Sequence, residues 1–198
     1  MNNMNYYQKH LSQIKDIKNR PTLLIHVCCG VCSVYPLLYL NKYFKVTVMY
    51  TNSNIYPYDE YNKRLEALET SINRFNKEIK LIIDNYDYNN YSLDLKPYKD
   101  LPEGNIRCKL CYEKRMDRSY EYACKHHYDY FTTVMSISNR KNANWINEIG
   151  EKLQIKYPST KYLYADFKKD DGITLNDKLN KELDLYHQTY CGCEFSIR

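Results

Sequence analysis

Eight cysteines provide most of the chemistry open to this 198-residue chain, and seven of them fall into three tight groups. Thiols at such short spacings gain nothing from one another as packing residues. They therefore predict metal ligation, redox exchange or disulfide formation, and we expect simple packing only of the isolated Cys124. The groups are a CCxxC, a CxxC and a CGC motif, formed by Cys28, Cys29 and Cys32, by Cys108 and Cys111, and by Cys191 and Cys193.

Each of the first two groups suits metal ligation. The CCxxC group lies between an apolar run and an expected helix, whose positive N-terminal end would favour the thiolates that metals bind. The alternative is a trio of small buried residues under that helix. Cys108 and Cys111 would share one face of a helix start, which suits zinc or an iron–sulfur cluster, but two thiolates need further ligands from elsewhere. The CxxxCxxC motif of radical-generating clusters is absent, because Tyr35 stands at its third place.

The CGC group could be a redox pair or two more metal ligands. A disulfide across one residue is strained, and strain raises its reduction potential. The dithiol would then be a reluctant electron donor, so both interpretations stay open. Other candidates are weaker: His26 suits a hydrogen-bonded core position, His187 and Tyr190 could donate protons, and Asp166 could be an acid, a ligand or a surface carboxylate.

The composition indicates the cellular compartment of the protein and the kinds of partner that it could bind. Residues 1–20 lack the apolar core of a secretory signal, so we predict a cytoplasmic protein with reduced thiols. Residues 21–41 carry no charge and could just span a bilayer, yet they include Gly30 and Pro36 and divide into two apolar pieces, so we predict no membrane segment. The net charge of +5 permits a polyanionic partner without demonstrating one.

The apolar pattern predicts alternating strands and helices. It indicates a polar N-terminal extension, residues 1–20, before one catalytic domain, residues 21–198. We expect a Rossmann-like α/β fold with a parallel sheet of about five strands and helices on both faces. Sites in such sheets form outside the carboxyl ends of the strands. The expected strands are 23–27, 46–50, 79–83, 130–134 and 162–164; the helices are 33–43, from 58, from 108, 143–153 and 176–185; residues 85–104 form a loop.

Five segments together resemble the cobalamin-independent epoxyqueuosine reductases of the QueH type, from Leu23 to the C-terminus. A CxxC motif alone would be weak evidence for this family, whereas the five segments in this order are specific to it. Gly30-Val31 departs from the Ala-Pro frequent in the family, and no expected ligand is affected. The segments are residues 23–33; Asn52–Pro57 with Glu60, Tyr61 and Arg64; Arg107–Tyr112 with Arg115; Phe131–Thr133 with Ser136, Ser138, Lys141 and Asn142; and Asp166–Lys169 with Gly172, Lys181, Glu182, Leu185, Tyr186, Gln188 and Tyr190–Cys193.

The resemblance implies an iron–sulfur oxidoreductase that acts on tRNA. It implies reduction of epoxyqueuosine to queuosine at the tRNA wobble position in queuosine biosynthesis, with electrons from an unidentified donor, and a fold related to the adenine nucleotide α-hydrolases. It also implies a 4Fe-4S cluster on Cys28, Cys29, Cys108 and Cys111, and a second iron or zinc ion on Cys32. It further implies a catalytic role for Cys191 and Cys193, which are often treated in the family as a redox-active disulfide pair, with shared or alternate metal ligation as the other option.

Three other functions compete with this one. A tRNA thiolase or ATP-dependent ligase would need a phosphate-binding loop rich in Ser and Gly after the first strand, where this chain has cysteines. A zinc-stabilised RNA-binding module without catalysis would be colourless and hold zinc. A thiol–disulfide oxidoreductase would leave five of the cysteines without a task. Iron and sulfide in brown, anaerobically purified protein would separate these alternatives from an iron–sulfur reductase.

Overall fold

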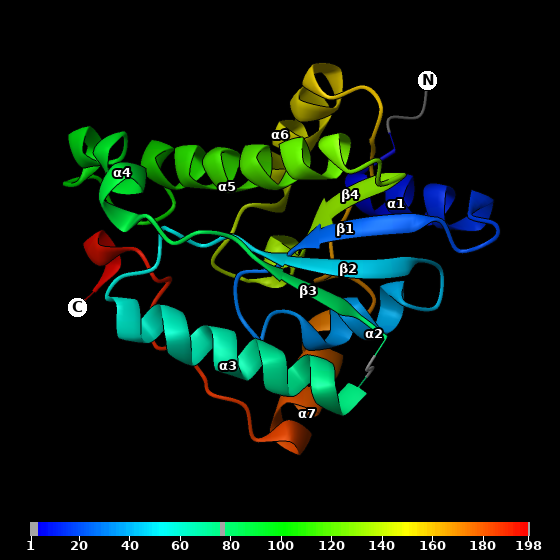
Figure 1. Ribbon diagram of the computed structural model, residues 1–198, viewed down its shortest axis with the longest axis horizontal. Helices are drawn as coiled ribbons and strands as arrows, with labels where there is room; N and C mark the ends of the chain where they lie inside the picture. The colour runs from blue at the N-terminus through cyan, green and yellow to red at the C-terminus, as the bar shows by residue number, and fades with distance from the viewer. Residues whose placement is uncertain (1–3, 76–77, 198) are drawn as a thin grey trace.

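Five short parallel strands form the centre of the computed structural model, which describes residues 4–75 and 78–197 (Figure 1). The strand order is β3-β2-β1-β4-β5, and all four pairings are parallel. This confirms the Rossmann-like α/β prediction. The strands are β1 Thr22–His26, β2 Lys45–Tyr50, β3 Lys80–Ile83, β4 Tyr130–Thr133 and β5 Lys161–Tyr162.

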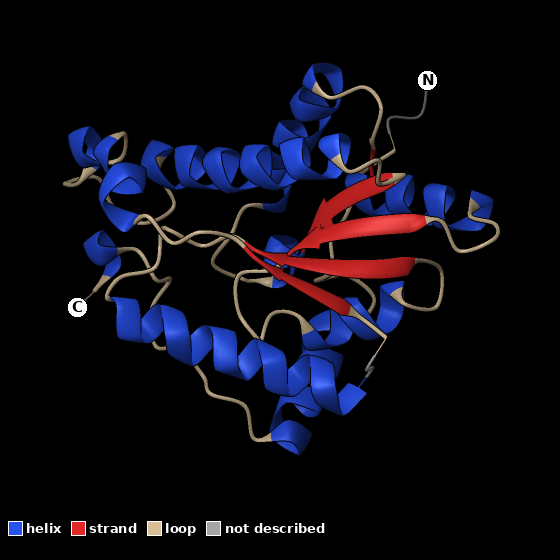
Figure 2. Cartoon of the chain, in the orientation of Figure 1, coloured by secondary structure: helices blue, strands red, loops and turns tan. Residues whose placement is uncertain are grey.

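Helices cover both faces of this sheet (Figure 2). On one side α5 lies across the strands and packs on α6, and on the other α2 packs on α7, with α3 alongside. Among the described residues, none of the helices is both long and apolar enough to cross a bilayer. The α-helices are α1 Tyr6–Asp16, α2 Val34–Leu40, α3 Tyr58–Phe75, α4 Tyr88–Leu93, α5 Ile106–Lys125, α6 Ala143–Lys156 and α7 Gly172–Leu183; the 3-10 turns are η1 Lys96–Tyr98, η2 Val134–Ile137 and η3 Glu194–Ser196.

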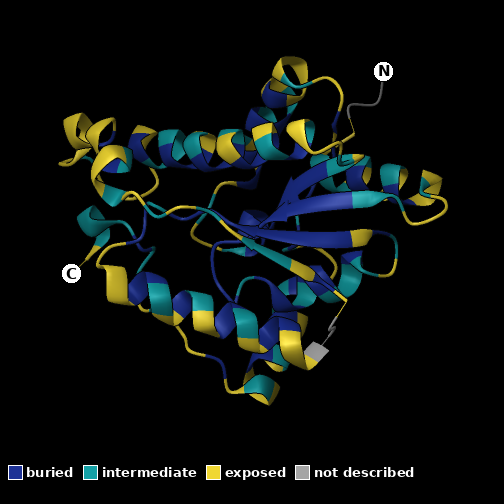
Figure 3. Ribbon diagram, viewed as in Figure 1, coloured by how far each residue is buried: buried dark blue, intermediate teal, exposed yellow. Residues whose placement is uncertain are grey.

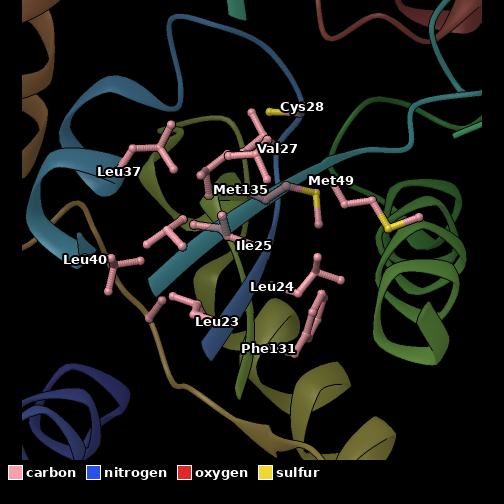
Figure 4. Close-up of a cluster of buried hydrophobic side chains, with 14 of the residues drawn as sticks. Leu23, Leu24, Ile25, Val27, Cys28, Leu37, Leu40, Met49, Phe131 and Met135 are labelled. Carbon is pink, nitrogen blue, oxygen red and sulfur yellow. The ribbon is translucent and has the colours of Figure 1, made fainter. Parts of the chain in front are cut away.

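The buried core follows the central strands (Figure 3). Leu23, Leu24 and Ile25 of β1 have no exposed surface, as expected for a strand flanked by two others and covered on both faces. Leu37 and Leu40 of α2 pack on the same core (Figure 4). The Cys28 side chain lies at the upper end of the cluster drawn in Figure 4, just beyond Val27, and the core continues into the cysteine loop through Cys28, Cys29 and Val31.

Most predicted elements are confirmed with shifts of a few residues, but three regions differ. Residues 85–104 are not one loop: Asp87 caps α4 by accepting a hydrogen bond from Asn90, and η1 follows. Their short, polar turns carry no apolar period by which the sequence could reveal them. Helix α7 begins four residues earlier than predicted, at Gly172. Within residues 1–20, α1 docks through His10 and Gln13 on the backbone beside β5.

Packing of α6 on the sheet leads to a stability prediction for Gly150→Ala. A Cβ at Gly150 would lie 2.2 to 2.4 Å from ring atoms of Tyr162, which is 1% exposed. Helix propensity favours alanine by about 1 kcal/mol, but overpacking of this kind costs roughly 1–3 kcal/mol. Contacts this short place the overpacking cost at roughly 2–3 kcal/mol, the upper part of that range, so we expect urea denaturation to show a net loss of about 1–2 kcal/mol. The double variant Gly150→Ala/Tyr162→Leu should regain part of the lost stability. A Gly150→Ala protein as stable as wild type would contradict the packing argument.

Candidate active site

The three cysteine groups gather beyond the carboxyl ends of the strands. The chain runs from β1 outward to β3 and then returns to β4 on the other side of β1, so the topological switch lies between β1 and β4. Ligand sites of open parallel sheets form at this place. The C-terminal segment, the first turns of α3 and α5, and α4 all lie off this end of the sheet in Figure 1.

The CCxxC loop follows β1 and brings three sulfur atoms together. The Sγ atoms of Cys28, Cys29 and Cys32 all lie within 4.8 Å of one another. Those of Cys28 and Cys29 are 3.8 Å apart. Cys28 and Cys29 are buried and Cys32 is half-buried. Three converging sulfurs at this depth are a suitable donor set for a thiophilic metal.

Hydrogen bonds from two directions hold this loop in shape. The Ser33 hydroxyl donates to the carbonyl of Gly30 at 2.6 Å and makes no capping hydrogen bond to α2. From α7, the Asn176 and Asn180 amides both donate to the carbonyl of Val31, at 2.8 and 2.9 Å. The loop is thus pinned at two neighbouring carbonyls between Cys29 and Cys32, which restricts the positions of the sulfurs.

The three thiols of the CCxxC loop differ in pKa. Hydrogen bonds from Cys29 and Cys32 hold the pKa of Cys28 well below its ordinary value, and the charges of Lys141 and Arg115 lower it further. The hydrogen bond to Cys28 raises the pKa of Cys29 to about 12. Hydrogen bonds to Cys28 and Cys29 raise the pKa of Cys32 as well. Cys28 therefore has the lowest pKa of the trio, and it is the thiol that loses its proton most readily to a metal ion.

The CxxC pair lies on the first turns of α5, on the opposite side of the same region. Asn105 caps this helix, and its side chain accepts a hydrogen bond from Ile106 N–H. The Cys108 sulfur accepts the Gly104 N–H at 3.3 Å, and burial raises the pKa of its thiol. The Cys111 sulfur is 3.3 Å from the Tyr91 hydroxyl of α4, which donates to it. Tyr91 belongs to the stretch wrongly predicted as loop, so the sequence did not reveal this contact.

Arg115 connects the three cysteine groups electrostatically. It is 3% exposed, and its Nη1 donates to Asn52, whose amide in turn donates to the carbonyl of Val27. Burial lowers the pKa of Arg115, but interaction with the ionised forms of Cys111, Tyr91, Cys28 and Cys191 raises it overall. One guanidinium group thus lies within reach of a thiol from each group. In the sequence Arg115 stood out as part of the third segment that resembles the family, without any sign of this electrostatic role.

Lys141 supplies a second positive charge to the same region. It ends the loop after β4, where Lys168 Nζ donates to the carbonyls of Ser136 and Lys141 at 2.9 and 3.4 Å. Burial lowers the pKa of Lys141, whereas interaction with the ionised forms of Cys191, Cys28 and Cys32 raises it, and the net pKa lies above the ordinary value. The loops after β1, β2 and β4 therefore meet at one place, as the fold rule predicted.

The CGC group lies in the irregular segment after α7. The Gln188 amide donates to the sulfur of Cys29 at 3.2 Å, so this segment passes beside the CCxxC loop. Burial raises the pKa of Cys193 to about 12, which keeps that thiol protonated at neutral pH. Cys191 and Cys193 are free thiols here, as are the other six cysteines.

The remaining sequence candidates lie mostly outside this cluster. His26 is fully buried, and its Nδ1 is 2.8 Å from the Thr133 hydroxyl, while burial lowers its pKa to about 3; it is a core residue, as expected. The Cys124 sulfur lies 3.0 Å from the Ser159 hydroxyl, near the far end of α5. Asp166 lies beside Lys168, at 3.6 Å.

An open cavity of about 610 Å³ lies beside the CxxC and CGC groups, and no cysteine is among its lining residues. Its wall includes Gly104, whose N–H donates to the sulfur of Cys108, and Tyr190, which directly precedes Cys191, so the cavity lies next to two of the three cysteine groups. Its volume is in the range of ligand-binding pockets. The lining residues are Glu103, Gly104, Arg140, Thr189, Tyr190, Ser196 and Ile197.

Comparison with known proteins agrees with this arrangement. The family model described as "Epoxyqueuosine reductase QueH" matches residues 23–198. Curated proteins of that name are similar to the chain over most of their length. The one from Streptococcus pyogenes serotype M1 is 37% identical, covering 90% of this chain and 71% of the relative. Those from Staphylococcus epidermidis and Thermotoga maritima are 35% and 33% identical, covering 96% and 89% of this chain and 82% and 90% of the relatives. The chain therefore belongs to the QueH family of epoxyqueuosine reductases.

Proposed function

We propose that this chain reduces the epoxide of epoxyqueuosine in tRNA to the alkene of queuosine. The reaction removes one oxygen atom as water and consumes two electrons, from an external donor, and two protons. The observation that carries the proposal is the convergence of the Cys28, Cys29 and Cys32 sulfurs at the switch point of the sheet, within one family match over residues 23–198. A thiol-rich site at this position suits electron transfer better than phosphate binding.

The thiols fit an iron–sulfur centre by number and chemistry. Cys28 and Cys29 from the loop after β1, with Cys108 and Cys111 from α5, would hold a 4Fe-4S cluster, and Cys32 would serve a second iron or zinc ion. Such a centre would supply single electrons and a Lewis acid for the departing oxygen. The close grouping of Cys32 with Cys28 and Cys29 also allows all three to serve the same metal group.

The protein's own residues would bind the nucleoside and manage protons. The 610 Å³ cavity has room for a modified base, and Arg140 on its wall carries the positive charge that suits a neighbouring phosphate. The Cys193 thiol, with its pKa raised to about 12 by burial, holds a proton on Sγ at neutral pH. It could deliver that proton to the oxygen, a role that does not require a strained Cys191–Cys193 disulfide.

The test is conversion of epoxyqueuosine-containing tRNA by anaerobically purified protein with a chemical reductant, followed by mass analysis of the nucleosides. We expect queuosine to form over multiple turnovers and the protein to contain iron and sulfide. Protein that is colourless, holds only zinc and binds tRNA without turnover would overturn the proposal in favour of an RNA-binding module.

The same assay decides the role of the CGC group. If Cys193 donates a proton, Cys193→Ser should slow turnover by roughly 10²–10⁴-fold while the iron content stays at the wild-type level. Cys191→Ser should slow turnover to the same extent only if Cys191 and Cys193 form a redox pair. Full multiple-turnover activity in both variants would exclude an essential role for either thiol.

A further inference from the structure

Arg64 of α3 is a buried cation that makes its bonds to a segment far away in the sequence. It is 2% exposed. Its Nε donates to Glu60 at 2.7 Å, on the same face of the helix. Its Nη1 donates to the carbonyl of Cys191 at 3.0 Å, and its Nη2 donates to the carbonyl of Tyr190 at 2.9 Å. The guanidinium fork therefore joins α3 to two consecutive carbonyls beside the CGC group.

The segment held by Arg64 has little structure of its own. Residues 184–193 form neither helix nor strand between α7 and η3. The carbonyl of Gly192 accepts the Tyr56 N–H at 2.8 Å, so three successive carbonyls are bonded to the start of α3 or to the loop before it. Glu60, which orients Arg64, also accepts the Tyr186 hydroxyl at 2.7 Å. Irregular segments depend on such contacts to keep one conformation.

The backbone also passes very close to the guanidinium. Gly192 has a φ of +106°, a conformation that side chains rarely adopt. A Cβ there would lie 2.9 Å from Nη1 of Arg64 and 3.1 Å from Ile55. Glycine at position 192 therefore lets the backbone approach closely enough for the carbonyls of Tyr190 and Cys191 to accept hydrogen bonds from Arg64.

We propose that Arg64, oriented by Glu60, is a positioning residue that sets where the Cys191 and Cys193 thiols lie beside the CCxxC loop. Arginine suits this task because its planar fork serves two carbonyls and a carboxylate at once, whereas lysine offers one flexible ammonium group. The effect on turnover rests on the proposed function, but the position of the two thiols does not.

Thiol alkylation of anaerobically purified full-length protein tests this directly. Iodoacetamide labelling would be followed at Cys191 and Cys193 by peptide mass spectrometry, with Cys124 as the internal reference. Loss of a charged hydrogen-bond donor to two carbonyls should release the segment, so Arg64→Lys and Arg64→Gln should label about ten-fold faster at both thiols. Arg74→Gln, an exposed position on the same helix, is the matched control and should label at the wild-type rate.

Two further measurements separate positioning from general stability. Positioning predicts an unchanged labelling rate at Cys124 and a fall in kcat with little change in KM for tRNA, whereas a merely structural role would speed labelling at all three thiols. Glu60→Gln, which keeps a weaker hydrogen bond to Arg64, should give an intermediate rate, and it decides the matter if the Arg64 variants do not fold. Wild-type labelling at Cys191 and Cys193 in a folded Arg64→Lys or Glu60→Gln protein would overturn the proposal. Labelling needs no turnover, so an inactive wild type would count against the reductase alone.

Discussion

Cys28→Ser is expected to abolish epoxyqueuosine reduction and to remove most of the bound metal. Cys28 has the lowest pKa of the trio, because Cys29, Cys32, Lys141 and Arg115 all lower it. A serine hydroxyl stays protonated at neutral pH and is a poor ligand for iron. Altering groups that merely support ligands already costs about 10–100-fold, so losing the ligand should reduce activity by at least about 100-fold. Iron and sulfide analysis beside the nucleoside assay measures both effects.

Cys124→Ser is the matched control for this prediction. It makes the same chemical change at a half-buried thiol bonded only to Ser159, near the far end of α5. We expect iron content and turnover within about two-fold of wild type, since surface changes have small effects. A Cys28→Ser protein that is folded by circular dichroism and retains full iron and activity would remove Cys28 from the site.

The second large effect is expected from Arg115→Gln. This change removes a buried positive charge that lowers the pKa of Cys28 and lies within reach of Cys111 and Cys191. Metal must displace protons from thiols, so a raised thiol pKa makes metal uptake weaker at a given pH. We expect the pH midpoint for iron or zinc uptake to move upward and the affinity at pH 7 to fall by at least about ten-fold.

Arg118→Gln is the control for that loss of charge. Arg118 lies one turn further along α5, is largely exposed and pairs with Asp84 at 2.8 Å. Exposed ion pairs contribute little, so its uptake curve should overlay that of wild type. Equal curves for Arg115→Gln and wild type would show that the buried cation does not tune the thiols.

The apolar pattern predicted the sheet and its main helices because buried strands and amphipathic helices have distinct periods. Leu23–Ile25 form a continuous apolar run, and Tyr112, Met116 and Tyr120 repeat along one face of α5. The pattern could not reveal α4, whose first turn is stabilised by Asp87 instead of a long apolar face. It also could not show α1 docked on the domain, because His10 and Gln13 make that contact through hydrogen bonds.

The site was predicted as a set of residues but only partly as an arrangement. The fold rule placed the CCxxC group at the carboxyl edge of the sheet. The family resemblance, and not cysteine spacing, implied that Cys108 and Cys111 share a centre with it. Charge partners are harder to predict, because Arg115 and Lys141 look like ordinary basic residues until burial and their neighbours are known. Tyr91 and the bonds of Arg64 to the C-terminal segment depend on contacts between distant parts of the chain, for which no local pattern exists.

Diffraction at the iron absorption edge, from crystals of protein purified and grown without oxygen, tests the central claim most directly. The account predicts iron bonded to the sulfurs of Cys28 and Cys29 on one side and of Cys108 and Cys111 on the other. Zinc held by Cys28, Cys29 and Cys32 alone, with no metal near α5, would contradict it.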